Sequence, residues 1–321
     1  MYENIVVGFD NSEYSKAAVI EASNFVKRHG GKFALAHAVY FNEEEFGLAP
    51  EKVDERFDFG TTVCNQAKNM VASEFGIDVD VLVRLGEPHE VLTDIAREQN
   101  ADLIAMGTNS RKGLKRLFMG SVTSTVIGKS PCDVLMVKKP STECTGTYSS
   151  ILVPFDGSED SRNALKKAAG ISKANGCNIT VLYVITRTKE IAGRLKNFFN
   201  ADSIQKNLRL EAEKILQMAQ EIAADAEVSI EVEIREGASD EQIVKAAYSL
   251  KSDLVVMGRY GHWRFDKTII GSTTKRVMMN APCPVLAVAV AAKRSWEAEG
   301  RKASRRLLSP YSQSLGASAE A

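Results

Sequence analysis

Glycine and serine residues in the second half of the chain have the spacing of a loop that could hold a phosphate group. Two residues separate Gly258 from Gly261, and nine more separate Gly261 from Gly271 and Ser272. Glycines let the backbone adopt positive φ and approach a ligand, so that successive N–H groups can surround an anion. We expect Ser272 to cap a helix over about 273–280, whose free N–H groups and dipole favour phosphate. The same residues could instead serve only a tight turn and a helix cap.

An aspartate closes the first apolar segment of the same half. Asp156 comes directly after ILVPF, residues 151–155. A carboxylate at the end of a strand can accept a hydrogen bond from a ribose hydroxyl. If it is buried, it needs a partner, because burying an unpaired carboxylate is costly. Groups that could bind a phosphate and a sugar thus lie in two separate loops.

Strands and helices must position these loops, and the apolar pattern predicts both. Apolar runs of strand length alternate with helical patterns, such as the amphipathic segment 200–224 and the helix between Ser12 and Gly30. Strands that are apolar throughout and alternate with helices predict a doubly wound α/β fold with a five-stranded parallel sheet. Ligands of such sheets bind beyond the carboxyl ends of the strands, where the strand order reverses. The strand-length runs of the first half are residues 5–9, 32–38, 79–85, 102–107 and 133–137.

The chain contains this unit twice. DLIAMGTNS to PCDVLMV at 102–137 matches DLVVMGRYG to PCPVLAV at 253–288 without a gap. The starts of the two halves, IVVGFDNSEYS at 5–15 and ILVPFDGSEDS at 151–161, match as well. A repeated unit of this size indicates two tandem domains of one fold.

The repeat sets the expected domain limits. We expect domains at residues 1–140 and 148–292, followed by a disordered tail at 293–321 that lacks a periodic apolar face.

Composition excludes several classes of protein. The 41 Lys and Arg residues balance the 41 Asp and Glu residues, so the basic excess of a nucleic-acid-binding protein is missing. No run of about 18 apolar residues predicts a membrane span, and the acidic start MYENIVVGFD is unlike a signal peptide. Five cysteines without CxxC spacing indicate reduced thiols in a cytoplasmic protein.

Taken together, these residues resemble the ATP-binding branch of the universal stress protein family. That branch carries G-x2-G-x9-G-[S/T] after its fourth strand and an Asp at the end of its first. The second half matches throughout, with Asp156 in DGSEDS. The first half has Asp10 in DNSEYS but carries Ser110 where the second glycine belongs. The resemblance covers nearly residues 1–290 and is that of a tandem member of the family. The fifth strands of single-domain relatives pair across a dimer. The resemblance therefore implies that residues 133–137 and 284–288 pair within this chain as an intrachain pseudo-dimer, which would cover two exposed sheet edges.

The resemblance implies which residues would bind ATP, with or without Mg²⁺. The phosphates would lie on the glycine loop and on the start of the following helix, the ribose near the Asp, and adenine against the end of the second strand. In the second half these positions are Asp156, Val184, Gly258, Gly261, Gly271, Ser272 and Thr273. Their counterparts in the first half are Asp10, Ala38, Gly107, Ser110, Gly120, Ser121 and Val122.

Ser110 predicts that the two sites differ. If its position needs a left-handed backbone, a residue other than glycine costs about 1–2 kcal/mol. A cost of this size weakens binding about tenfold. We therefore expect the second site to be filled and the first to be weaker.

The function that the resemblance implies is that of a nucleotide-dependent regulator in stress adaptation, whose bound state is read by a protein partner. Two alternatives stay open, a slow ATPase and an interaction module without nucleotide. Neither a Walker-type Lys nor a nucleophile paired with a base is present, which argues against rapid turnover. Trp263 and Phe265 could cover adenine or pack against a partner, and a homodimer of whole chains stays open.

Overall fold

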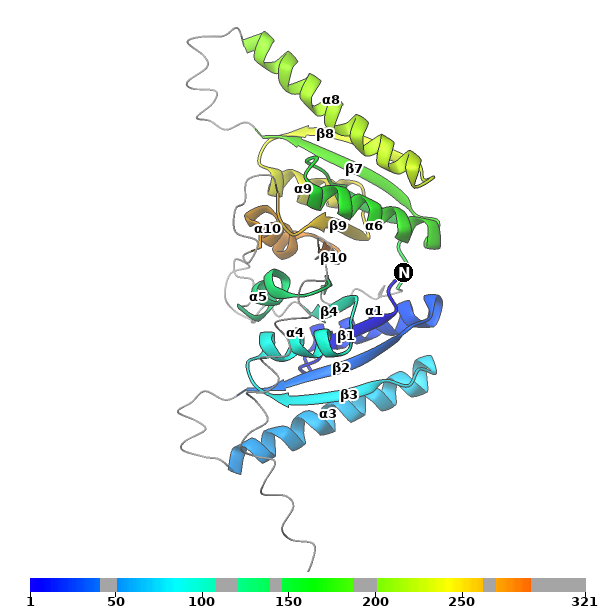
Figure 1. Cartoon of the computed structure of the whole chain (residues 1–321), viewed down its shortest axis with the longest axis vertical. Helices are drawn as coiled ribbons and strands as arrows, with labels where there is room; N and C mark the ends of the chain where they lie inside the picture. The colour runs from blue at the N-terminus through cyan, green and yellow to red at the C-terminus, as the bar shows by residue number, and fades with distance from the viewer. Residues whose placement is uncertain (41–50, 108–120, 139–145, 187–200, 262–269, 290–321) are drawn as a thin grey trace, which may run out of the picture. The chain divides into compact units, whose positions relative to one another are not determined.

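The computed structural model describes residues 1–40, 51–107, 121–138, 146–186, 201–261 and 270–289 (Figure 1). The first half consists of β1 (Asn4–Gly8), α1 (Glu13–His29), β2 (Lys32–Val39), α3 (Glu51–Phe75), β3 (Asp80–Leu85), α4 (Pro88–Glu98), β4 (Leu103–Gly107), α5 (Ser121–Lys129) and β5 (Asp133–Val137). The second half consists of β6 (Ser150–Pro154), α6 (Glu159–Asn175), β7 (Asn178–Ile185), α8 (Ala201–Asp225), β8 (Ile230–Glu236), α9 (Ser239–Ser249), β9 (Leu254–Gly258), α10 (Ser272–Asn280) and β10 (Val285–Val288).

All of these strands belong to one ten-stranded sheet. Its order is β3-β2-β1-β4-β5-β10-β9-β6-β7-β8. Neighbouring strands within each half are parallel, so each half is a five-stranded parallel sheet, as expected. The strand order reverses between β1 and β4 and again between β6 and β9, which are therefore the two switch points where ligands of this fold bind. The predicted domain limits at 140 and 292 and the tail at 293–321 lie outside the described residues.

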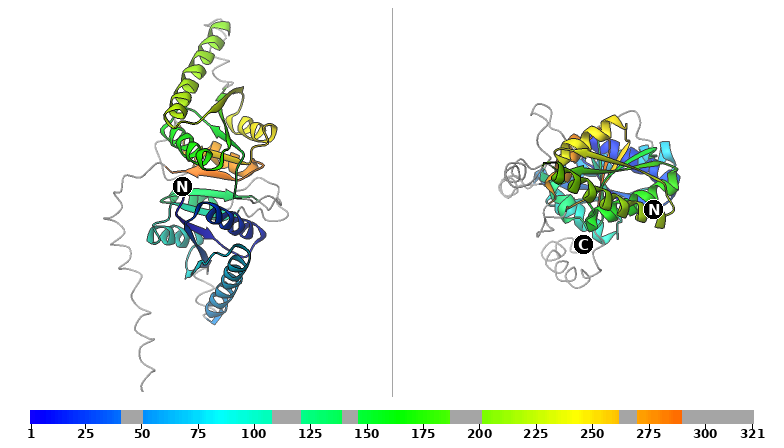
Figure 2. Two further views of the ribbon diagram at one scale, coloured as in Figure 1. Left: turned by 90° about the vertical axis from the view of Figure 1, so that its right-hand side faces the viewer. Right: turned by 90° about the horizontal axis from the view of Figure 1, so that it is seen from above.

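Helices cover both faces of the sheet (Figure 2). Residues of α1, α3, α6 and α8 form one apolar cluster with the sheet, and residues of α4, α5, α9 and α10 form a second. The first helix of each half begins as the sequence predicts. Ser12 caps α1 and Ser158 caps α6, each with its hydroxyl oxygen accepting a hydrogen bond from an N–H three residues later. No helix among the described residues is long and apolar enough to cross a membrane.

The two halves meet where β5 pairs with β10. This pairing is antiparallel and sets Leu286 opposite Leu135 and Ala287 opposite Val134. Every residue of both strands is buried. The expected pairing of the fifth strands within the chain is thus confirmed.

Asp133, at the start of β5, is the charged centre of this junction. Its side chain is 8% exposed, and one of its oxygens lies 3.1 Å from Nζ of Lys167 on α6. The same carboxylate accepts hydrogen bonds from the Tyr2 hydroxyl at 2.7 Å and from the Ala289 N–H at 2.8 Å. Burial, and then the charge of Asp133, raise the pKa of Tyr2, so its phenol stays a donor. Because Lys167 and Ala289 belong to the second half, this buried carboxylate fastens the two halves together.

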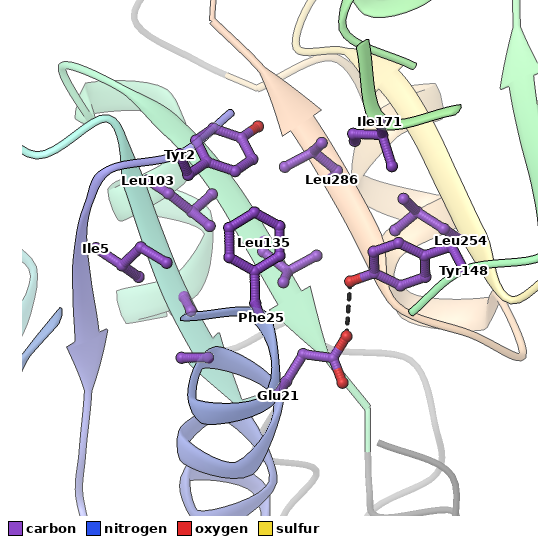
Figure 3. Close-up of a pocket in the computed structure, with 12 residues that line it drawn as sticks. Tyr2, Ile5, Glu21, Phe25, Leu103, Leu135, Tyr148, Ile171, Leu254 and Leu286 are labelled. Atoms are coloured by element: carbon purple, nitrogen blue, oxygen red, sulfur yellow. Dashed lines mark hydrogen bonds between the residues drawn. The ribbon is translucent and has the colours of Figure 1, made fainter. Parts of the chain in front are cut away.

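The repeat counterpart of Lys167 makes a different kind of contact at this junction. Glu21 on α1 occupies the position that Lys167 has on α6, and Glu21 Oε1 accepts a hydrogen bond of 2.6 Å from the Tyr148 hydroxyl (Figure 3). Tyr2, the counterpart of Tyr148, lies under Lys167, with its ring centre 4.5 Å from Nζ. Tyr2, Glu21 and Tyr148 border an apolar cavity of about 20 Å³ between the halves, too small for a nucleotide. The two halves therefore differ from each other in the residues that they place at the interface between them.

Reversing the charge of Lys167 tests this junction. We expect Lys167→Glu to lower the free energy of unfolding by about 1–3 kcal/mol, because it sets a second carboxylate beside the buried Asp133. The effect stays in this range because the new carboxylate would be partly solvated. The exposed neighbour Lys166 provides the control. Lys166→Glu should change the free energy of unfolding by no more than about 0.5 kcal/mol. Urea unfolding of both variants gives the comparison, and equal effects would show that the Asp133 contact contributes nothing.

Candidate functional site

Asp156 lies two residues beyond the end of β6, at the switch point of the second half. Its Oδ1 accepts hydrogen bonds from the Ser158 N–H at 3.0 Å and from the Ser158 hydroxyl at 2.5 Å. These contacts hold the carboxylate in a fixed orientation at the start of α6. The half-buried Asp156 is thus a preorganised acceptor at the edge where the sheet order reverses.

Gly261 meets Asp156 across this edge. A Cβ atom added to Gly261 would stand 3.1 Å from Oδ2 of Asp156. The loop after β9 and the loop after β6 therefore come together, although their residues are far apart in the sequence. The missing side chain at Gly261 leaves space next to the carboxylate that any other residue would fill.

The start of α10 differs from the expectation. Ser272 does not cap the helix: Gly271 occupies the cap position, and Ser272 is the exposed first residue of α10. The reason is that the Gly271 N–H already donates to the Arg259 carbonyl at 3.0 Å and the Lys275 N–H bonds back to the Gly271 carbonyl. No side chain caps α10. The half-buried Thr273 follows Ser272 in this first turn.

The end of β7 forms the other side of the candidate site. Val184 is half-buried and is the second-to-last residue of β7. Its neighbour Tyr183 was not expected from the sequence. Burial, followed by the charges of Glu211 and Asp156, raises the pKa of Tyr183, which places its phenol in the electrostatic field of Asp156. An aromatic residue at the end of a second strand is the only sequence signal for it.

The candidate site residues of the first half that the structure describes lie at the equivalent positions. Asp10 Oδ1 accepts from the Ser12 N–H at 3.0 Å, and the Asp10 N–H donates to the Ser15 hydroxyl. Partial burial raises the pKa of Asp10, but the hydrogen bonds with Ser12 and Ser15 outweigh it and hold that pKa below its usual value. Ala38 is half-buried near the end of β2, and Ser121 and Val122 open α5. Ser110 and Gly120 lie outside the described residues.

The glycines that end β4 and β9 have a packing requirement of their own. A Cβ on Gly107 would stand 2.3 Å from the backbone carbon of Tyr14, and one on Gly258 would stand 2.5 Å from Cβ of Asp160. Each glycine therefore lets the first turn of α1 or α6 lie directly against the strand. This close packing accounts for both residues without any ligand, and a binding role for them stays a prediction.

Arg259 and Tyr260, between Gly258 and Gly261, were not among the site residues expected from the sequence. Arg259 is only 4% exposed, and its side chain enters the first half. Nothing in the local pattern G-R-Y-G indicates this, because the groups that it binds are carbonyls about 130 residues earlier in the chain.

The described cysteines lie in the core. Burial raises the pKa of Cys132 to about 11 and that of Cys283 to about 12, so both thiols stay protonated. Within the described ranges, no three His, Cys, Asp or Glu side chains gather closely enough to hold a metal ion.

The family model for the universal stress proteins matches this chain twice, at residues 1–138 and 147–289. The chain belongs to the universal stress protein family. The two matches cover both halves and leave a short connection between them, so it is a tandem member. The expected family and the two-domain organisation are thereby confirmed.

Individual relatives agree with this assignment. A universal stress protein of Methanocaldococcus jannaschii is 32% identical over 141 residues, which are 44% of this chain and 82% of the relative. The crystal structure of a universal stress protein from Archaeoglobus fulgidus covers 89% of this chain and 97% of its own, with a TM-score of 0.68 and 18% identity. That likeness shows the tandem fold alone.

A further solved universal stress protein is described as a complex with cAMP. It covers 44% of this chain and 98% of its own, with 24% identity and a TM-score of 0.36. The nucleotide is a property of that protein.

The packing requirement at Gly258 predicts a loss of stability. We expect Gly258→Ala to lower the free energy of unfolding by about 1–3 kcal/mol, because its Cβ would overlap Asp160. Gly170→Ala in α6, where an added Cβ meets nothing within 4 Å, should instead be neutral or stabilising by up to about 1 kcal/mol. Urea unfolding measures both. Wild-type stability in Gly258→Ala would contradict the packing explanation.

Proposed function

We propose that this protein binds ATP at the carboxyl edge of its second half and acts as a nucleotide-dependent regulator in stress adaptation. The observation that carries the proposal is the meeting of Asp156 and Gly261 at the switch point between β6 and β9. An acceptor for ribose hydroxyls, a glycine of the loop that lies close against it, and a helix start without a side-chain cap lie on the same edge. This set of groups fits a nucleotide.

Each residue has a role that follows from its chemistry. The Asp156 carboxylate would accept hydrogen bonds from the ribose. The N–H groups of the loop at Gly261 and of the first turn of α10, with Ser272 and Thr273, would bind the phosphates. The backbone at Val184 would contact adenine. Any Mg²⁺ would be held by the phosphates themselves.

The two sites are proposed to differ in affinity. Asp10 and Ala38 repeat the arrangement of Asp156 and Val184, but Ser110 replaces the loop glycine. We therefore propose that the second site is filled first and that the first site, with Gly107, Gly120, Ser121 and Val122, binds more weakly.

A regulatory role suits this site better than rapid catalysis. Its proposed groups hold and orient a nucleotide, and the sequence carries no Walker-type Lys. A regulator also needs a partner that distinguishes bound from free protein. We place it in the cytoplasm, where thiols such as the four buried free cysteines of the described residues stay reduced.

The nucleotide content of the purified protein tests the proposal. We expect close to one ATP per chain when fresh protein is denatured and its supernatant is separated by anion exchange. Gly261→Val should lose this nucleotide, because its side chain would fill the space beside Asp156. The matched control is Gly170→Val, on the open surface of α6, which should keep it.

Other outcomes separate the alternatives. Bound ADP would favour the slow ATPase and would be followed by a turnover assay. A protein that is empty and takes up no added ATP in calorimetry would overturn the proposal and favour the interaction module.

A further inference from the structure

Arg259 connects the candidate nucleotide loop of the second half to the first half. Its Nη1 donates a hydrogen bond of 2.8 Å to the Ser130 carbonyl, and its Nη2 donates to the Cys132 carbonyl. Next to it, the Tyr260 hydroxyl donates to the Gly128 carbonyl at 3.3 Å. All three acceptors lie at or just beyond the C-terminal end of α5. Two successive loop residues thus bind one helix end in the other half.

The chemistry of this contact suits a buried cation. The C-terminal end of a helix carries unpaired carbonyls and the negative end of the helix dipole, which a guanidinium can satisfy. Burial lowers the pKa of Arg259, while the charge of Asp133 acts in the opposite direction. Removing the guanidinium would leave buried carbonyls at Ser130 and Cys132 with fewer donors.

The backbone of the same residue holds the start of α10. The Arg259 carbonyl accepts the Gly271 N–H at 3.0 Å, and the neighbouring Gly258 carbonyl accepts the Thr274 hydroxyl at 3.0 Å. The phosphate-facing turn of the proposed site is therefore fixed to Arg259 on one side. On the other side, the Arg259 side chain is fixed to α5.

We propose that Arg259 is a positioning residue for nucleotide binding in the second half, and that this site is completed by the first half. The inference rests on the proposed function and deepens it. The Arg259 side chain does not touch the nucleotide; it holds the loop in the binding geometry from across the domain junction. By thermodynamic linkage, nucleotide bound in the second half must in turn stabilise the C-terminal end of α5 in the first.

The test uses the full chain with Asp10→Ala, which disables the first site and leaves a single binding event. ATP binding is measured by calorimetry for this background, for Arg259→Met and for Arg259→Lys. We expect Arg259→Met to raise Kd about tenfold or more and Arg259→Lys to restore part of the affinity. Arg276→Met on α10, whose side chain pairs with Asp240 within the second half, is the matched control and should bind like the background.

A second readout separates positioning from a general loss of stability. Hydrogen–deuterium exchange of peptides covering residues 126–132 follows the α5 end, where the Ser130 N–H bonds to the Val126 carbonyl at 2.7 Å. ATP should slow this exchange in the background and not in Arg259→Met. If Arg259→Met fails to fold, Tyr260→Phe, which removes a single hydroxyl, serves in its place, with a smaller change in the same direction.

The outcomes distinguish the two proposals. If the background binds ATP but Arg259→Met has the same Kd, and ATP leaves exchange at 126–132 unchanged, this inference is wrong and the proposed function stands. If the wild-type chain binds no ATP, both are overturned.

Discussion

The antiparallel pairing of β5 with β10 joins two parallel five-stranded sheets, and the contacts between the two halves depend on it. The Asp133 carboxylate is buried at this junction, where Lys167, Tyr2 and the Ala289 N–H surround it and offset the cost of its burial. The pairing also brings the loop after β9 next to the end of α5, so that Arg259 can reach it. The Asp133 carboxylate at the start of β5 and the Arg259 guanidinium in the loop after β9 therefore stabilise the same junction.

Local patterns predicted most of the fold. The strand expected at 133–137 has those limits in the structure, and the helix expected between Ser12 and Gly30 is α1. Apolar runs, a serine cap and a glycine stop are all properties of neighbouring residues, so the sequence carries them directly. The repeat then extended each element to the second half.

The candidate site was less predictable, because its contacts join distant segments. The approach of Gly261 to Asp156 agrees with the expected switch point. The cap position of α10, however, is Gly271 and not Ser272, because the Gly271 carbonyl accepts the Lys275 N–H. The glycine motif also combines residues with different requirements: Gly258 packs against a helix, and Gly261 lies against the Asp156 carboxylate. Spacing alone cannot separate these two needs.

The difference between Glu21 and Lys167 has a consequence during synthesis on the ribosome. The first half leaves the ribosome before the second, while the edge of β5 is still unpaired. The first halves of neighbouring chains on the same mRNA are then the nearest alternative partners for that edge. Two first halves joined as the halves are here would set Asp133 of each chain against Glu21 of the other, and carboxylates would be buried together without a cation. Each nascent chain is thereby disfavoured from joining its neighbours and left to complete the sheet with its own second half.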